Sequence, residues 1–441
     1  MRTYIKDLKN KIGEEVSIFG SVDVRRDHGK LVFIDLRDVS GKIQMVALPS
    51  HKEAHELAGK LRPEWVVKIV GKVNKRPEKM VKEAEPNGNV ELEIVSIEIL
   101  SQAHELPFSK ETEINLDTYL DYMPLTLRTA RARSIFKVQS VILKAYRNFL
   151  MDNGFTEFQS PKLVGEDAEG GAGVFKVDYF YDRNAYLATS PQFYKQIMVG
   201  VFERVFTVGT VFRAEKHSTT RHLNEYTSMD MEMGFIKDHT TIMETETALL
   251  HEIVRVLREE CSEQFALLRA ELPKLPREIP SMKLRSAQRL ITETTGVDCT
   301  NEPDLEPQHE RWLCEYSKNK LNSDFIFITH YPIEKRPMYT YEDENDRGFT
   351  KSFDLLFRGV EITTGGQRIH EYDKLIEKIK WKGFDPKKFT YYLQAFKYGM
   401  PPHGGFGMGL ERLTAKFLGL DSVKEATLFP RDINRIDQLL A

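Results

Sequence analysis

The sequence lacks the features that mark metal-rich, secreted and membrane proteins. Its three cysteines, Cys261, Cys299 and Cys314, form no CxxC pair, which argues against a zinc site or a disulfide scaffold and fits a reducing compartment. No apolar run approaches membrane-spanning length, and the first residues lack the apolar segment of a signal peptide. We therefore expect a cytoplasmic protein without a membrane anchor.

The sequence also lacks an excess of either charge. Its 441 residues include 63 basic and 66 acidic ones, a formal net charge of −3. Overall charge therefore does not indicate a nucleic-acid partner, and any contact with RNA must come from local basic patches. The length predicts two or three domains with ample core.

Residues 1–104 contain short β-like runs, with a helical segment (52–61) after the third. The runs span residues 15–24, 31–36, 42–48, 65–73 and 90–100. Five strands with a helix after the third is the order of an OB-fold barrel, a common platform for single-stranded nucleic acid. Candidate contacts are cations for phosphates, a ring for stacking and an amide for a base edge: Arg25, Arg26, Phe33 and Gln44. Taken alone, Phe33 is more typical of a hydrophobic core, and the pair Arg25 and Arg26 is more typical of a solvated turn.

Residues 105–128 have weak periodicity and include Pro107 and Pro124, so we expect a hinge there and a second domain over 129–441. In that domain, residues 212–235 read FRAEKHSTTRHLNEYTSMDMEMGF, which predicts two strands joined by a polar loop. Alternation along the second strand puts Met229 and Met231 on one face and Tyr226 and Asp230 on the other. The same period places Arg213 and Glu215 on one face of the first strand.

Two further segments have chemistry-bearing patterns. Residues 352–370 predict a hairpin on which Asp354 and Glu361 lie diagonally on one face, where two carboxylates suit a cation such as Mg²⁺. Glycines at 404, 405, 407 and 409 precede a helix starting near Leu410, with Arg412 in its first turn. Such glycines allow backbone to approach a ligand, and a helix start attracts anions. A Rossmann phosphate loop is the competing interpretation, but GxGxxG is not matched.

These segments resemble class II aminoacyl-tRNA synthetases. The FRAE and RHLNEYTSMDMEM arms are similar to motif 2, HGGFGMGLER to motif 3, and the helix and proline-ending strand before residue 161 to motif 1, which builds a dimer interface in the family. The sequences RRDHGKLVFIDLRDVSGKIQ and SPQFYKQ resemble aspartyl-tRNA synthetases in particular. The resemblance implies an α+β fold: an OB-fold anticodon-binding barrel, then a catalytic antiparallel sheet flanked by helices.

The resemblance also implies a role for each matching residue. Arg213 and Arg412 are the catalytic residues. Arg213 contacts the α-phosphate of ATP, and Arg412 and His222 contact the outer phosphates. Tyr226 stacks on adenine, and Glu215, Arg221 and Glu361 complete the ATP site. Mg²⁺ lies on Asp354, Glu361 and Thr364. The aspartate site comprises Lys195 and Arg368 for the side-chain carboxylate, Glu169 and Asp230 for the ammonium group, and Ser190 and Gln192.

The implied function is the ATP-dependent ligation of L-aspartate to tRNA(Asp) by a homodimer. An enzyme that also charges tRNA(Asn) is the closest alternative, because the two anticodons differ only at the third base. An asparagine ligase is disfavoured by Lys195, since asparagine would leave a buried cation unpaired at a cost of roughly 2–5 kcal/mol. A silent RNA-binding paralogue is disfavoured by the presence of Arg213 and Arg412, and a tRNA-independent aspartate-activating enzyme by the intact barrel.

Overall fold

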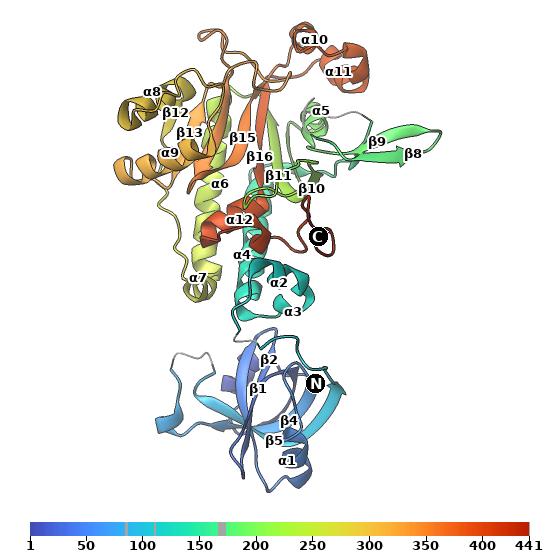
Figure 1. Cartoon of the computed structure of the whole chain (residues 1–441), viewed down its shortest axis with the longest axis vertical. Coiled ribbons are helices and arrows are strands. Elements are labelled where there is room, and N and C mark those ends of the chain that lie inside the picture. The colour runs from blue at the N-terminus through green and yellow to red at the C-terminus, as the bar shows by residue number, and fades with distance from the viewer. Residues whose placement is uncertain (84–86, 110–111, 166–172, 441) are drawn as a thin grey trace. The chain divides into compact units, whose positions relative to one another are not determined.

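The computed structural model describes residues 1–83, 87–109, 112–165 and 173–440. The chain divides into two compact units, Met1–Glu113 and Ile114–Ala441 (Figure 1). Each unit has its own hydrophobic core. Across the described ranges, no helix is both long and apolar enough to cross a bilayer.

The first unit is a closed barrel with strand order β1-β2-β3-β5-β4. Its strands are β1 (Glu15–Asp27), β2 (Val32–Asp38), β3 (Gly41–Ala47), β4 (Val66–Lys75) and β5 (Val90–Ser101). Helix α1 (Lys52–Ala58) follows β3, and the 3-10 helices are η1 (Ile5–Asn10) and η2 (Glu78–Met80). Alternate residues such as Ile34 and Leu36 fill the barrel, while Phe33 and Arg37 face outward. The predicted OB-fold is confirmed.

The second unit is built on an eight-stranded sheet with order β12-β13-β14-β15-β16-β11-β10-β6. The edge pairs β12–β13 and β6–β10 are parallel, and the other pairs are antiparallel. The strands are β6 (Thr156–Glu157), β10 (Arg204–Phe212), β11 (Glu225–Gly234), β12 (Ser281–Lys283), β13 (Phe325–Thr329), β14 (Ser352–Phe357), β15 (Val360–Arg368) and β16 (His403–Gly409). The predicted central antiparallel sheet is confirmed, with one parallel strand added at each edge.

Helices cover this sheet, and long helices α4 and α6 pack against each other beside it (Figure 1). Their apolar faces share a core with Met229, Met231 and Met233 of β11. The helices are α2 (Leu116–Asp121), α3 (Met123–Thr126), α4 (Ala130–Asp152), α5 (Gln192–Phe202), α6 (His239–Glu260), α7 (Ser262–Leu268), α8 (Leu284–Thr295), α9 (Pro307–Lys320), α10 (Tyr372–Trp381), α11 (Thr390–Lys397) and α12 (Leu410–Leu418), with 3-10 helices η3 (Pro386–Phe389) and η4 (Val423–Ala426).

Two segments differ from the pattern that the sequence suggests. The expected hinge at 105–128 contains α2 and α3, and the compact units divide after Glu113. The predicted hairpin at 212–235 is present as β10 and β11, paired from Phe212 opposite Glu225. However, β10 ends at Phe212, so Arg213 and Glu215 lie in the connecting loop rather than on a strand face. The loop backbone stays fixed at its start, because Arg213 N–H donates to the Asn224 carbonyl at 2.9 Å and Ala214 N–H to the Gly173 carbonyl at 2.8 Å.

Candidate active site

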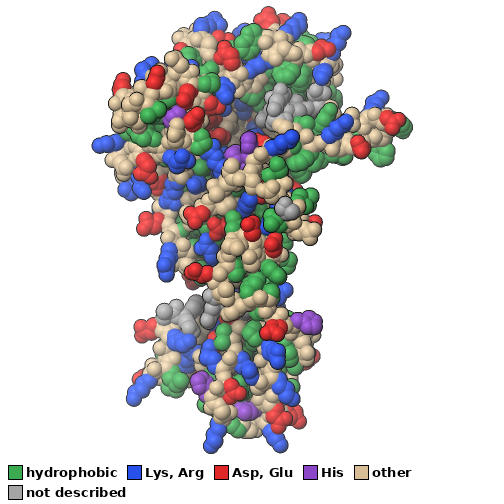
Figure 2. All heavy atoms as spheres, viewed as in Figure 1, with side chains coloured by type: hydrophobic (Ala, Val, Ile, Leu, Met, Phe, Trp, Pro, Cys, Tyr) green, Lys and Arg blue, Asp and Glu red, His purple; other side chains and the backbone are tan. Residues whose placement is uncertain are grey.

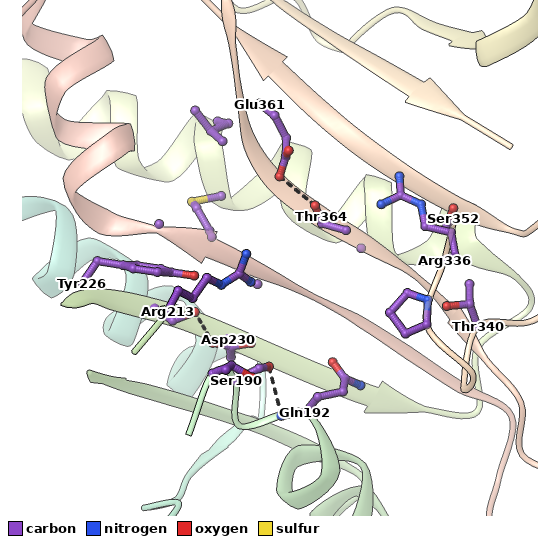
Figure 3. A pocket seen from close by; sticks show the side chains of 18 of the residues that line it. Ser190, Gln192, Arg213, Tyr226, Asp230, Arg336, Thr340, Ser352, Glu361 and Thr364 are labelled. Carbon is purple, nitrogen blue, oxygen red and sulfur yellow. Dashed lines mark hydrogen bonds between the residues drawn. The ribbon is translucent and has the colours of Figure 1, made fainter. Parts of the chain in front are cut away.

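A cavity of about 740 Å³ opens on the second unit, and it contains the four cations on which the sequence hypothesis depends. Arg213, Lys195, Arg368 and Arg412 all line it, although they come from a loop, α5, β15 and α12. Nine other predicted residues line the same cavity: Ser190, Gln192, Glu215, Arg221, His222, Tyr226, Asp230, Glu361 and Thr364. Figure 3 labels Ser190, Gln192, Tyr226, Asp230, Glu361 and Thr364 among them. The fold therefore brings together residues that are up to 222 positions apart in the chain, from Ser190 to Arg412.

One end of the cavity is a buried network of paired charges. The Lys195 ammonium lies 3.0 Å from Asp230 Oδ1 and 3.4 Å from Glu232 Oε2. Arg368 donates through Nε to Glu232 Oε1 at 2.9 Å and through Nη2 to the Gly405 carbonyl. The side chains of all four residues are at most 6% exposed. Two cations and two carboxylates thus compensate each other before any ligand binds.

This network corrects one step of the sequence argument. Lys195 and Arg368 are not unpaired cations awaiting a substrate, because Asp230 and Glu232 already balance them. Burial alone would raise the pKa of Glu232, but Arg368 and Lys195 together hold that pKa below its ordinary value of 4.5. The sequence patterns indicated no role for Glu232. Its two-residue spacing from Asp230 on β11 was the signal that could have identified it.

The other end of the cavity is partly exposed: the side chains of Arg213, Glu215 and His222 are 33%, 28% and 27% exposed. Arg213 lies with its guanidinium carbon 5.9 Å from the Tyr226 ring centre, and its Nη1 is 3.9 Å from Glu215 Oε1. His222 Nδ1 is 2.7 Å from the Thr219 hydroxyl, and its Nε2 is 4.0 Å from Glu215. Burial lowers the pKa of His222, and Arg412 and Arg221 lower it further against the opposing effect of Glu215. A flat ring and several cations suit a nucleotide here.

Two arginines border this end from different elements. Arg412 stands in the first turn of α12, which begins at Leu410 as predicted, and its Nη1 donates to the Glu361 carbonyl at 2.6 Å. Arg221 Nη1 lies 2.8 Å from Glu310 Oε2 on α9. Burial raises the pKa of Glu310, and the adjacent Arg221 opposes that shift. No periodic pattern indicated Glu310, because only tertiary packing brings α9 to the cavity.

The predicted acidic pair is split between the cavity and the interior. Asp354 pairs with Thr364, and Leu356, two residues on, pairs with Glu361, so the diagonal arrangement is confirmed. Glu361 and Thr364 line the cavity, and the Thr364 hydroxyl donates to Glu361 Oε1 at 2.7 Å. Asp354 is not among the lining residues. Its Oδ2 lies 2.8 Å from Arg336, a residue that sequence reasoning missed.

The oxygen donors in this region fit a hard divalent cation such as Mg²⁺. A carboxylate and a hydroxyl face the cavity at Glu361 and Thr364. Burial raises the pKa of Asp354 to about 6, and the neighbouring Arg336 guanidinium opposes this rise. Glu361 and Thr364 are therefore the better placed ligands, with Asp354 behind them.

The glycines of β16 serve the sheet more than a ligand. A Cβ on Gly405 would overlap the Met231 carbonyl oxygen of β11, and one on Gly404 would lie 2.7 Å from the Gly366 carbonyl oxygen of β15. A Cβ on Gly407 would crowd Asp230 at 2.9 Å. The interpretation of a ligand-cradling loop is thus corrected for Gly404 and Gly405, which permit close packing between strands. The Rossmann alternative is excluded because this strand lies in an antiparallel part of the sheet.

Comparison with known protein families identifies the family to which this chain belongs. Residues 115–433 match the family model described as "tRNA synthetases class II (D, K and N)", and residues 16–100 match "OB-fold nucleic acid binding domain". The chain is a class II tRNA synthetase. The cavity residues discussed above all lie within the first match.

Several relatives of this synthetase match it over nearly full length. A Thermus thermophilus protein named aspartate-tRNA(Asp/Asn) ligase is 46% identical over 99% of this chain and 100% of that one. A Thermococcus kodakarensis protein named aspartate-tRNA(Asp) ligase is 39% identical over 96% of both chains. The structure of asparaginyl-tRNA synthetase from Pyrococcus horikoshii, complexed with asparaginyl-adenylate, superimposes with a TM-score of 0.91, at 32% identity over 99% of each chain.

The barrel of this synthetase brings together three of the four predicted anticodon contacts. Arg26 lies opposite Phe33 on the outward face, and Gln44 lies opposite Asp35. Arg26 donates two hydrogen bonds to Asp35, at 3.0 and 2.9 Å. Arg25 points the other way and donates to the carbonyl of Gly59 after α1. Adjacent strand residues face opposite sides, so the grouping of Arg25 with Arg26 is corrected.

The structure does not describe one of the predicted site residues of this synthetase. Glu169 lies outside the described residues, in the gap 166–172. Among residues that sequence reasoning missed, Arg336 is the clearest case. It lines the cavity and lies 3.8 Å above the ring centre of Tyr331. It stands in an irregular segment between β13 and β14, where no periodicity could indicate its direction.

Proposed function

We propose that this synthetase ligates L-aspartate to tRNA(Asp) through an aspartyl-adenylate, using ATP and releasing AMP and pyrophosphate. The observation that carries the proposal is the buried pair Lys195 and Arg368 at the closed end of the cavity. Relatives named as aspartate ligases, at up to 46% identity, support it. Since Asp230 and Glu232 already balance both charges, a carboxylate ligand is selected by the hydrogen-bond donors that the two cations offer.

Selection of aspartate over asparagine follows from the donors that Arg368 offers. Among the described residues its hydrogen bonds use Nε and Nη2, and Nη1 is available for an acceptor. A carboxylate presents only acceptors there, whereas an asparagine amide in one orientation points its own N–H groups at the guanidinium. Discrimination by mismatched buried polar groups is strong, so a separate editing site is not required.

Adenylate formation requires two anions to meet. The aspartate α-carboxylate attacks the α-phosphorus, the bond to the β-phosphate oxygen breaks, and pyrophosphate leaves. Since the nucleophile is already ionised, the protein supplies alignment and positive charge rather than a base. We assign Arg213 to the α-phosphate, His222 and Arg412 to the outer phosphates, and Tyr226 to the adenine.

Further side chains complete the substrate sites. Glu215 and Arg221 border the nucleotide, and Asp230, with Ser190 and Gln192 nearby, attracts the substrate ammonium. Glu361 and Thr364 would hold Mg²⁺, which when bound neutralises phosphate charge. In the second step a terminal ribose hydroxyl of tRNA attacks the aspartyl carbonyl, and AMP leaves.

A second candidate is the same reaction with tRNA(Asn) as an additional acceptor. It is favoured by the Thermus thermophilus relative, whose name includes both tRNAs. We further propose that the protein acts as a homodimer, as the motif 1 resemblance predicts, and that it is cytoplasmic. An asparagine ligase has the support of the structural similarity at 32% identity, but the relatives named as aspartate ligases match this chain at 39% and 46% identity.

Aminoacylation with separate tRNA(Asp) and tRNA(Asn) transcripts tests the proposal. We expect aspartate to be attached to tRNA(Asp), and attachment to tRNA(Asn) as well would select the second candidate. Pyrophosphate exchange should depend on aspartate. Exchange that is driven by asparagine instead would refute the proposed amino-acid specificity.

A further inference from the structure

Three buried polar side chains form a hydrogen-bonded chain behind the closed end of the cavity. Tyr392 of α11 donates to Gln196 Oε1 at 3.0 Å, and Gln196 Nε2 lies 2.9 Å from His403 Nε2. His403 Nδ1 lies in turn 2.9 Å from the Pro401 carbonyl oxygen. The three side chains belong to residues that are at most 3% exposed. Within the described ranges none of the three lines the active-site cavity, so they act on it indirectly.

The direction of this chain fixes the proton of His403. A backbone carbonyl only accepts hydrogen bonds, so the nitrogen that faces Pro401, Nδ1, carries the hydrogen. In a neutral ring Nε2 is then an acceptor, and it receives an N–H from Gln196. Burial and the nearby Arg368 lower the pKa of His403 to about 4, against the opposing effect of Glu232. The ring is therefore neutral at physiological pH.

The strand β16 is a common reference for the two cations that bind the substrate side chain. Lys195 and Gln196 are consecutive on α5, and both reach β16, Lys195 at the Phe406 carbonyl at 2.9 Å and Gln196 at His403. Arg368 lies opposite His403 in the β15–β16 ladder and donates to a carbonyl of β16 at 2.9 Å. The contact of Gln196 thus holds the helix of one cation against the strand that holds the other.

Helix α5 is held from its outer side by Tyr392. In the chain it precedes β10 and follows a small sheet with strand order β7 (Leu163–Val164), β9 (Arg183–Leu187) and β8 (Lys176–Tyr179). The Tyr392 ring stacks on Phe193 of α5 with ring centres 4.3 Å apart, and its hydroxyl contacts Gln196, three residues further on the same helix face. These two contacts restrict rotation of α5, which would carry the Lys195 ammonium away from Asp230.

Buried charges depend on such support more than exposed ones do. Figure 2 shows basic and acidic side chains scattered over the visible surface of the second unit, where water can compensate them. The charges of Lys195, Arg368 and Glu232 lie in the interior, where an ion pair is favourable only with well-defined geometry. A small shift of α5 against β16 therefore changes the donors that a ligand meets.

We propose that Gln196 is a positioning residue, which through Tyr392 and His403 sets the spacing of Lys195 and Arg368 and thereby favours a carboxylate over an amide. The inference rests on the proposed function, because it concerns the amino-acid end of the same cavity. Since the hydrogen-bonded chain lies behind this end, its loss should weaken amino-acid binding and leave the nucleotide end unaltered.

Gln196→Met tests the proposal, because methionine keeps the length of the side chain but offers no amide. In pyrophosphate exchange we expect the KM for aspartate to rise about tenfold or more. The ratio of kcat/KM for aspartate to that for asparagine should fall, and the KM for ATP should stay unchanged. Partial unfolding would lower kcat by reducing the amount of active protein, but it would change neither the KM for aspartate nor that ratio.

The matched control is Gln394→Met, the same change on the exposed face of α11. It should leave the KM for aspartate and the ratio as in the wild type. If Gln196→Met also left both unchanged, Gln196 would not position the two cations.

A milder variant shows whether the three residues act as one chain. Tyr392→Phe removes the hydroxyl and keeps the ring that stacks on Phe193. We expect it to raise the KM for aspartate a few-fold in the wild type and not further in Gln196→Met, where the contact is already absent. Effects that multiply instead would contradict the chain. Tyr391→Phe, at a position 75% exposed, is the control for the lost hydroxyl.

The tautomer of His403 gives a test that needs no substrate. NMR of the protein with 15N-labelled histidine should show a proton on Nδ1 and none on Nε2 at neutral pH, with the signals assigned by their loss in His403→Gln. A proton on Nε2 would overturn the proposed chain. Exchange driven by asparagine in the wild type would instead refute the proposed function, and the effect of Gln196→Met on the KM for asparagine would still decide whether Gln196 positions the cations.

Discussion

The two ends of the active-site cavity hold their charges in opposite ways. At the closed end the side chains of Lys195 and Glu232 are 1% and 0% exposed, and each already has an oppositely charged partner. At the open end the side chains of Arg213 and His222 are 33% and 27% exposed, and carboxylate oxygens of Glu215 lie 3.9 and 4.0 Å from them. The closed end is therefore preorganised, and the open end can adapt.

This difference matches the two tasks that we propose. Choosing between two amino acids of similar size needs fixed donors in a dry site, where a wrong hydrogen-bond pattern is costly. Holding a triphosphate needs positive charge whose exact position can follow the ligand while the reaction proceeds. Variants at the closed end should consequently have large, specific effects, and variants at the open end smaller and graded ones.

The largest effect is expected from Lys195→Leu. The change removes a buried cation and leaves Asp230 and Glu232 with one fewer partner, a loss of roughly 3–5 kcal/mol in the aspartate-bound state. Aspartate-dependent pyrophosphate exchange should fall below detection, while ATP binding measured by calorimetry persists. Unchanged exchange would refute the assignment of substrate recognition to Lys195.

Glu232→Gln should destabilise the folded protein by about 3 kcal/mol, because Arg368 and Lys195 would share less negative charge in a buried site. Since the folded-state pKa of Glu232 is below 4.5, its contribution is complete above pH 4.5 and is lost as pH falls through the lowered pKa. Urea unfolding at neutral pH and at pH 4 measures both effects. The variant should lack the decrease in stability that protonation of Glu232 causes in the wild type. If the variant were as stable as the wild type at neutral pH, Glu232 would not have the structural role proposed here.

Arg213→Lys should have an intermediate effect at the open end. Lysine keeps the charge but loses the planar guanidinium beside Tyr226. We expect kcat for adenylate formation to fall about tenfold, as for loss of one charge-stabilising contact, with the KM for aspartate unchanged. A raised KM for aspartate would show that the two ends are not independent.

The smallest effect concerns His222. Burial lowers its pKa from the ordinary 6.5, so the ring is neutral above pH 6.5 in the free protein. Phosphates favour the imidazolium, so ATP binding should take up a proton and tighten a few-fold as pH falls from 7.5 to about 6. Calorimetry in two buffers of different ionisation enthalpy measures the uptake. In His222→Gln it should disappear, and its persistence would place the titrating group elsewhere.

Much of the site was predictable because its residues stand on regular elements. Two-residue alternation placed Tyr226 and Asp230 opposite the buried methionines, and the start of α12 placed Arg412. Where the backbone leaves regular structure, the same reasoning failed: β10 ends before Arg213, and Arg336 stands between strands. The roles of the individual residues, and the partners they imply, came from motif resemblance and not from periodicity.

The sequence by itself determined the barrel, the antiparallel sheet and the motif residues, since hydrophobic periodicity and motif spacing are local properties of the chain. Only the tertiary structure decided which charges compensate one another. The pairing of Arg368 with Glu232, and of Asp354 with Arg336, joins positions far apart in the chain. The strength of a charge interaction depends on distance and burial, which arise only when the strands and helices pack together.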